Sequence, residues 1–431
     1  MTATRTRRWL LRIGAMLLTL VGLTVAAAAL LLRAWQAGPD DWAVTVRLGP
    51  VERALSVPAL VRAATHPVGM WLLDGRRWRT RFGELSWQRY ADGHTLYGRC
   101  EPCTLHLPAL GDTPVALERV AWTLRREGQN RFHGTVGLGQ GDRMIRGTWR
   151  GELSDAALAV QLHLQQAPIA QYYALFGPGI PELQRARIDG RAIVQLRARL
   201  PDGTVQLSTQ VDGFEVAGLG TEALRTATPA SHCTRPQPAG DPGPWLPQAV
   251  IAAEDQRFHE HRGYDPVEMA AAWRRNQRDG APTRGASTLT QQLAKLAYTG
   301  SDRSHVRKLR ELLYAVEMER TLGKARILEL YLSLAPWGEG TCGAEAAARH
   351  LLGKPARQLT PLEAAWLASL LRSPDAQLAR WRAAGEVDRA ALARIVGGMR
   401  GLTSAQRRPL KDRLAHWQPA APAASGTPAG M

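Results

Sequence analysis

Cysteine is scarce in this sequence of 431 residues, and its four cysteines do not form a metal-binding pattern. Cys100 and Cys103 enclose a CEPC run, while Cys233 and Cys342 stand alone. Without a second closely spaced pair, a structural zinc site is disfavoured. No βαβ pattern flanks the CEPC run, so a thioredoxin-like redox site is disfavoured as well. A local disulfide and two free thiols in a turn both stay open.

Acidic residues are also in the minority. The chain has 55 Lys and Arg residues against 38 Asp and Glu residues, and its formal net charge of +17 comes mainly from arginine. A basic surface suits an anionic bilayer or an anionic substrate. The basic residues are dispersed along the chain. In addition, the membrane anchor predicted in the next paragraph would place most of the chain outside the cytoplasm, away from nucleic acid. We therefore expect no nucleic-acid partner.

A long uncharged run lies near the N-terminus. Residues 13–32 contain no charge, and about 20 apolar residues are enough for a helix to cross a bilayer. Arginines precede the run, so the N-terminus is predicted to be cytoplasmic and the chain after Arg33 periplasmic. A cleaved signal peptide is the alternative, because residues 26–29 are small, but the run exceeds the usual apolar core of about 7 to 15 residues. We expect residues 1–35 to anchor a single-pass inner-membrane protein.

The middle of the chain shows the period of half-buried strands. Apolar residues alternate with small or polar ones over 158–164 and 192–200, which predicts strands. A Pro-Asp-Gly turn at 201–203 separates the second run from 205–211 and predicts a hairpin. We expect a β-rich domain over residues 36–225. No catalytic constellation occurs in it, so it is assigned no role beyond a hypothetical spacer or docking function.

The pattern changes after this domain. A short helix is expected within the β-rich part at 167–175. Residues 226–247 are rich in Pro, Ala and Gly and predict a linker. Residues 248–400 are predicted to form a mainly helical domain whose last helix covers 378–399. The remainder, 401–431, is predicted to be a disordered tail.

Five dense runs of residues begin at Glu254 and follow one another in a fixed order. They read EDQRFHEHRGYD, RGASTLTQQLAK, RKLRE, KARILELYLSLAPWGEGTCGAEAAARHLLGK and LTPLEAAWLASLLRSP. In the second run, Thr288 and Gln291 have the spacing of a capping box, which predicts a helix start. Free amides at a helix start favour phosphate oxygens, and Arg284, Ser287 and Thr288 would add guanidinium and hydroxyl donors.

Two further pairs have helical spacing. Gln292 and Lys295 are three residues apart, so both are expected to point into one cleft. Arg307 and Glu311 are four residues apart and would share a helix face, where such a pair is ordinarily a solvated ion pair. The spacing turns Lys308 away from Glu311 and makes it a weaker candidate for substrate binding.

The order and spacing of the five runs resemble the peptidoglycan glycosyltransferases of family 51, of the monofunctional biosynthetic type. The resemblance covers somewhat under a third of the chain. It implies a lysozyme-like, mainly α domain that polymerises lipid II into glycan strands with inversion and releases undecaprenyl pyrophosphate. No SxxK or KTG motif follows the fifth run, so no transpeptidase module is expected.

The resemblance also implies roles for individual residues. Glu254 would be the base that deprotonates the acceptor hydroxyl, and its neighbour Asp255 would bind substrate. Glu311 would be the second carboxylate of the site. Lys295 and Arg307 would hold the pyrophosphate, and a divalent cation such as Mg²⁺ or Mn²⁺ is a further candidate for this task.

Three departures from the family pattern bear on rate and affinity more than on reaction type. Ser333 stands where asparagine is usual, Leu296 stands where asparagine often follows the lysine, and residues 350–352 replace an aromatic pair. Residues 266–282 mix apolar and basic side chains, as a membrane-interface segment does. An ordinary surface helix fits the same residues equally well, but the family resemblance implies that this part lies near the bilayer. Membrane lipids are therefore expected partners besides lipid II and the growing strand.

Two other functions remain open from the sequence. A lytic enzyme that cleaves glycan also uses a glutamate in a lysozyme-like fold. A scaffold with weak catalysis is the second, in which the β-rich domain would bind other cell-wall synthesis proteins.

Overall fold

The computed structural model describes residues 16, 19, 22–23, 33, 35–48, 51–105, 114–229, 233, 240–279, 287–300 and 304–420. Apart from residues 16, 19, 22 and 23, the predicted span 13–32 lies outside this set, and so does Arg284. Among the described residues, no helix combines the length and apolar character that a bilayer crossing requires.

The chain divides into two compact units. One comprises Met1–Leu105, Val115–Ala167 and Ala192–Gln210, and the other comprises His106–Pro114, Pro168–Arg191 and Val211–Met431. Residues 168–191 and 211–225 thus group with the helices rather than with the β-rich domain predicted over 36–225. The division follows the contacts of the folded chain, which a linear change of composition does not reveal.

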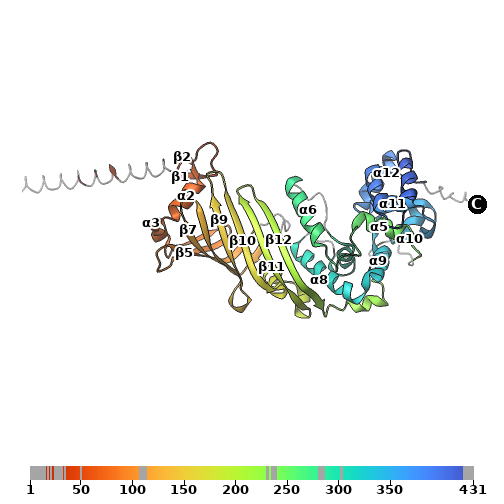
Figure 1. The fold of residues 1–431 in the computed structure, drawn as a ribbon, viewed down its shortest axis with the longest axis horizontal. Helices are drawn as coiled ribbons and strands as arrows, with labels where there is room; N and C mark the ends of the chain where they lie inside the picture. The colour runs from red at the N-terminus through yellow and green to blue at the C-terminus, as the bar shows by residue number, and fades with distance from the viewer. Residues whose placement is uncertain are drawn as a thin grey trace, which may run out of the picture. The chain divides into compact units, whose positions relative to one another are not determined.

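One large sheet dominates the strand-rich part of the chain. Within the described residues it has ten strands, in the order β12-β11-β10-β9-β8-β7-β5-β4-β3 with β6 beside β5, and Figure 1 shows β9 and β10 side by side. The strands are β3 Arg77–Thr80, β4 Gly83–Arg89, β5 Thr95–Leu105, β6 Val115–Leu117, β7 Val120–Glu127, β8 Arg131–Leu138, β9 Ile145–Leu153, β10 Leu158–Pro168, β11 Arg187–Leu200 and β12 Thr204–Ala217. The predicted strands and the 201–203 turn are confirmed.

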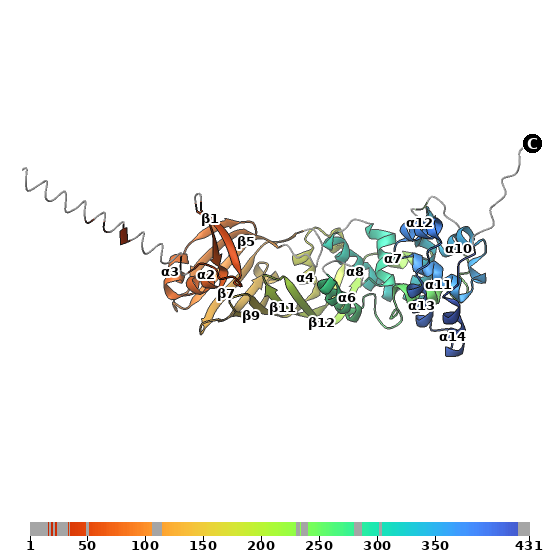
Figure 2. The ribbon, with the colours of Figure 1, turned by 90° about the horizontal axis from the view of Figure 1, so that it is seen from above.

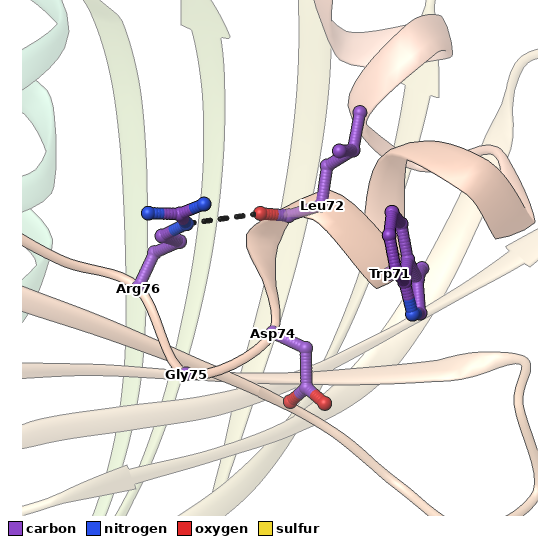
Figure 3. A pocket seen from close by; sticks show the side chains of 5 residues that line it. All are labelled: Trp71, Leu72, Asp74, Gly75 and Arg76. Carbon is purple, nitrogen blue, oxygen red and sulfur yellow. Dashed lines mark hydrogen bonds between the residues drawn. The ribbon is translucent and has the colours of Figure 1, made fainter.

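A smaller hairpin and two helices precede this sheet. They are β1 Ala43–Leu48, β2 Val51–Ser56, α2 Val57–Ala64 and α3 Pro67–Leu73. A cavity of about 340 Å³ at the end of α3 is lined by Trp71, Leu72, Asp74, Gly75 and Arg76 (Figure 3). Its lining belongs to the first compact unit, whereas every predicted site residue that the structure describes belongs to the second.

Both cysteine pairs form disulfides. Cys100 and Cys103 are joined within β5, with their Cα atoms 5.2 Å apart. Cys233 and Cys342 are joined across 109 positions of the chain. Of the two possibilities left open for the CEPC run, the structure has the local disulfide.

The second unit is mainly helical. Its elements are α4 Ile169–Phe176, η3 Pro181–Gln184, η4 Thr221–Arg225, α5 Leu246–Glu254, α6 Pro266–Asp279, α7 Leu289–Ala294, the π-helix η5 Lys295–Thr299, α8 His305–Thr321, α9 Gly323–Leu334, β13 Pro336–Gly338, β14 Thr341–Cys342, α10 Ala344–Leu352, η6 Ala356–Gln358, α11 Pro361–Leu370, α12 Pro374–Ala384, α13 Arg389–Gly398 and α14 Ser404–Arg413. Figure 2 shows α13 beside α11 and α14 beside α13. The short helix predicted at 167–175 is confirmed as α4.

Two predictions for the C-terminal part are wrong. The predicted disordered tail 401–431 contains α14, because Thr403 caps this helix and Leu402 and Leu414 are buried on either side of it. The single helix predicted over 378–399 is two helices, since Gly385 adopts a left-handed conformation with φ 64° and ends α12.

The capping boxes of α7 and α14 allow a stability prediction. Thr403→Val, in α14, should lower the free energy of unfolding by about 1 kcal/mol through loss of the cap. Thr288→Val should cost about 2 to 4 kcal/mol, because the Thr288 hydroxyl also donates a hydrogen bond to the buried Gly263 carbonyl. Calorimetry on both variants measures the difference. Equal melting temperatures for the two would contradict this account.

Candidate functional site

Glu254 ends helix α5, which starts with Pro247 in its first turn. The half-buried carboxylate of Glu254 accepts a hydrogen bond of 3.0 Å from Nε2 of Gln292 on α7. Oε1 of Gln292 accepts a hydrogen bond of 2.9 Å from the hydroxyl of Tyr331 on α9. The two bonds orient the amide with its NH₂ group toward Glu254. A neutral donor therefore positions the predicted base.

Tyr331 is the member of this chain of hydrogen bonds that the sequence analysis missed. Its side chain is buried at 2 % exposure. Burial, and then the negative charge of Glu254, raise the pKa of Tyr331 well above its usual value. The hydroxyl therefore stays protonated and remains a donor to Gln292. The sequence held one signal for this contact: Tyr331 lies within the apolar run of α9, and a buried hydroxyl needs a hydrogen-bond partner.

Asp255 holds the segment after α5 in place. Its two carboxylate oxygens each lie 3.0 Å from Nε2 of His261, and Oδ2 accepts a hydrogen bond of 2.9 Å from the backbone N–H of Leu289. Asp255 and His261 are both buried. These contacts give Asp255, which was predicted to bind substrate, a structural task between α5 and α7.

Gly263 brings the same segment against α8. Its φ is +91°, and a Cβ atom at this position would lie 2.7 Å from the carbonyl oxygen of Ala315. Only glycine fits both the backbone conformation and the close approach. The Gly263 carbonyl accepts the hydrogen bond from Thr288 at 2.6 Å, so this loop, α7 and α8 form one packed group.

The start of α7 forms hydrogen bonds with its own cap and with Asp255. The capping box of Thr288 and Gln291 is confirmed. However, the Leu289 amide donates to Asp255 and the Gln291 amide donates to the Thr288 hydroxyl. These two amides and the Thr288 hydroxyl therefore have partners within the protein, and phosphate binding by the start of α7 stays a prediction.

A cluster of charges lies on the first turns of α8. Glu311 is buried at 1 % exposure. Its Oε1 forms an ion pair with Nη1 of Arg307, and its Oε2 lies 2.7 Å from Nζ of Lys308. Nζ of Lys308 also donates a hydrogen bond of 2.7 Å to Oγ of Ser287. The prediction that Lys308 turns away from Glu311 is wrong, because a long side chain three positions away reaches the carboxylate.

The positive charges of the cluster influence one another. Burial of the ammonium group, and then the positive charges of Arg307 and Lys295, lower the pKa of Lys308 to about 8. Lys308 is therefore charged below about pH 8 and neutral above it. Lys295 is exposed in η5 and lies close enough to act on Lys308. With one carboxylate among three basic side chains, the cluster as a whole is positive and suits an anionic group.

The side chains around Glu311 do not fit a resident divalent cation. Mg²⁺ and Mn²⁺ prefer oxygen ligands, but both carboxylate oxygens of Glu311 already bind basic side chains. Across the portions of the chain with described coordinates, no three His, Cys, Asp or Glu residues gather as a metal site. The positive charge at this position comes from Arg307, Lys308 and Lys295.

The departures from the family pattern have ordinary structural partners. Oγ of Ser333 donates a hydrogen bond of 2.9 Å to the carbonyl of Glu329, one turn earlier in α9. Leu296 is half-buried in η5. His350 pairs with Glu339 at 2.9 Å. None of these side chains disturbs the contacts of Glu254 or Glu311 described above.

The arrangement places two kinds of chemistry on one scaffold. Gln292 of α7 contacts Glu254, and Ser287, immediately before the α7 cap, contacts Lys308. A carboxylate with a fixed orientation can accept a proton from a hydroxyl. A positive cluster can stabilise a departing anion. Transfer of a group from a phosphate to a hydroxyl needs both functions: a base accepts the proton of the hydroxyl, and positive charge stabilises the departing phosphate.

Part of the chain matches a known family. Residues 225–396 match the family model described as Transglycosylase. The biosynthetic peptidoglycan transglycosylase of Nitrosomonas eutropha is 46 % identical over 129 residues, which are 30 % of this chain and 53 % of that protein. That of Aeromonas hydrophila is 51 % identical over 129 residues, 30 % of this chain and 54 % of that protein. The chain spans about half the length of these curated relatives. It thus contains a transglycosylase domain.

The lowered pKa of Lys308 can be measured directly. Competitive acetylation at a series of pH values, read by mass spectrometry, should give a reactivity midpoint of about 8 for Lys308. Lys295→Gln should raise this midpoint, because it removes a positive charge that disfavours the ammonium form. Lys411→Gln, on α14, is the control and should leave it unchanged. A wild-type midpoint near the ordinary lysine value of about 10.4 would refute the assignment.

Proposed function

We propose that this protein polymerises lipid II into peptidoglycan glycan strands by inverting glycosyl transfer and releases undecaprenyl pyrophosphate. One observation carries the proposal: the region that matches the transglycosylase family contains both an oriented carboxylate, Glu254, and the positive cluster around Glu311. The names of the relatives support the choice of a peptidoglycan substrate.

In the proposed reaction Glu254 acts as the base. Its carboxylate takes the proton from the GlcNAc hydroxyl of the acceptor, and the hydroxyl oxygen attacks the anomeric carbon of the lipid-linked donor. A new glycosidic bond forms as the bond from the anomeric carbon to the pyrophosphate oxygen breaks. The bonding electron pair leaves with undecaprenyl pyrophosphate. Gln292 and Tyr331 keep the Glu254 carboxylate in one orientation during the attack.

The cluster on α8 receives the leaving group. Lys308, Arg307 and Lys295 supply the positive charge for the pyrophosphate, and Glu311 holds Arg307 and Lys308 at fixed positions through its two oxygens. This use of the cluster favours synthesis over glycan cleavage, because hydrolysis of a glycan releases no anion of this kind.

We also propose that the protein works at the inner membrane with its catalytic part in the periplasm. Helix α6 supports contact with lipid, because Val267 and Met269 expose 54 % and 42 % of their surface and Arg274 is exposed on the same helix. Such a mixture of apolar and basic side chains suits the interface of an anionic bilayer. Residues 13–32 would supply the anchor. A lysozyme-like fold and binding of other cell-wall proteins by the strand-rich part remain predictions.

The role of Glu254 can be tested with purified lipid II and detergent-solubilised protein. Glu254→Gln keeps the shape of the side chain but removes the base, so the rate of glycan formation should fall by about 10²- to 10⁴-fold. Glu329→Gln, which changes a glutamate 58 % exposed on α9, is the matched control and should leave the rate unchanged. A rate of glycan formation in Glu254→Gln equal to the measurable wild-type rate would show that the base is another residue.

A further inference from the structure

Helix α8 carries a second stripe of polar contacts beside the cationic cluster. Arg310, Tyr314, Glu317 and Thr321 follow one another at intervals of three or four residues, which places them along one side of the helix. Their partners come from η3 and the 219–225 segment, which belong to the same compact unit as α8. None of these four residues is among the predicted site residues described above.

The strongest of these contacts joins Arg310 to Glu182 of η3. Nε of Arg310 lies 2.9 Å from each carboxylate oxygen of Glu182, and Nη2 lies 2.7 Å from Oε1. The hydroxyl of Tyr314 donates a further hydrogen bond of 3.2 Å to Oε1. Burial would raise the pKa of Glu182, but the hydrogen bonds and charge of Arg310 outweigh it and hold this pKa below its usual value. The ion pair is therefore maintained although Glu182 is buried and Arg310 is half-buried.

Two further contacts hold other positions of the helix. Glu317, buried at 1 % exposure, accepts hydrogen bonds from the amides of Leu219 and Thr221 at 2.9 and 3.2 Å and from the Thr221 hydroxyl at 2.9 Å. The hydroxyl of Tyr173 in α4 donates to the carbonyl of Leu309 at 3.2 Å, and Figure 2 shows α4 beside α8. Contacts along its length thus restrict both rotation and sliding of α8.

These contacts are better suited to orientation than to stability. A buried ion pair contributes little net stability, because desolvation of both charges offsets their attraction. The bidentate Arg310–Glu182 pair, by contrast, is directional and tolerates little rotation. Arg310 is adjacent to Glu311 in the chain, so a rotation of α8 about its axis would displace Glu311 and with it Arg307 and Lys308.

We propose that Glu182 and Arg310 are positioning residues: through them the η3 segment sets the rotation of α8 and so the placement of Arg307, Lys308 and Glu311. The inference rests on the proposed function and deepens it. It also gives the segment 168–191, which the sequence analysis placed in a domain without an assigned role, a task in the reaction.

The test uses the full-length protein and the variants Glu182→Gln and Arg310→Lys. Both weaken the bidentate pair, and Arg310→Lys keeps the positive charge. We expect kcat for lipid II polymerisation to fall about 10- to 100-fold, the effect of a misplacement of about 1 Å, with little change in KM. The acetylation midpoint of Lys308 should also shift from its wild-type value. Arg349→Gln, which removes an exposed ion pair of α10 with Glu345, is the control and should change neither quantity.

Several outcomes decide the proposal. A lower melting temperature with kcat and the Lys308 midpoint at their wild-type values would mean that the pair is only structural, and the proposal would fall. If wild type itself forms no glycan, the proposed function fails, and the Lys308 midpoint alone then decides whether Glu182 acts on the cluster. Should Glu182→Gln not fold, as judged by circular dichroism, Arg310→Lys decides. Tyr314→Phe, which removes one hydrogen bond to Glu182, takes its place if that variant also fails.

Discussion

The carboxylate of Glu311 is buried at 1 % exposure, and the first turns of α8 are organised around its charge. A buried carboxylate is costly unless it is paired and hydrogen-bonded. Arg307 satisfies one oxygen and Lys308 satisfies the other. The two basic side chains are therefore held side by side although they repel each other. Because both contact Glu311, Arg307 and Lys308 form a positive surface of fixed geometry, and Lys295 adds its charge to this surface.

Helix α7 connects this surface to the base. Its capping residue, Thr288, is tied to the Gly263 loop, and its first amide is tied to Asp255, the neighbour of Glu254. Gln292 then reaches Glu254 itself. Polar residues that the sequence suggested for substrate binding thus serve to hold α5, α7 and α8 together. The chemistry that we propose depends on this packing as much as on the two glutamates.

Local patterns predicted part of this arrangement. The capping box of Thr288 and the turn at 201–203 follow from short-range rules, and the structure confirms both. The contact of Tyr331 with Gln292 and that of Glu182 with Arg310 join residues 39 and 128 positions apart. No periodicity encodes such pairs. For the same reason the sequence suggested free amides at the start of α7, where tertiary contacts supply acceptors.

The two glutamates have different tasks in this account: Glu254 accepts the proton, whereas Glu311 organises the positive charges. The pH dependence of kcat/KM for lipid II in the Glu311→Gln variant tests this distinction most directly, because the acidic limb of the profile reports the base of the free enzyme. The account predicts a reduced rate with an acidic limb at the same pH as in wild type. Loss of that limb would show that Glu311, and not Glu254, is the base.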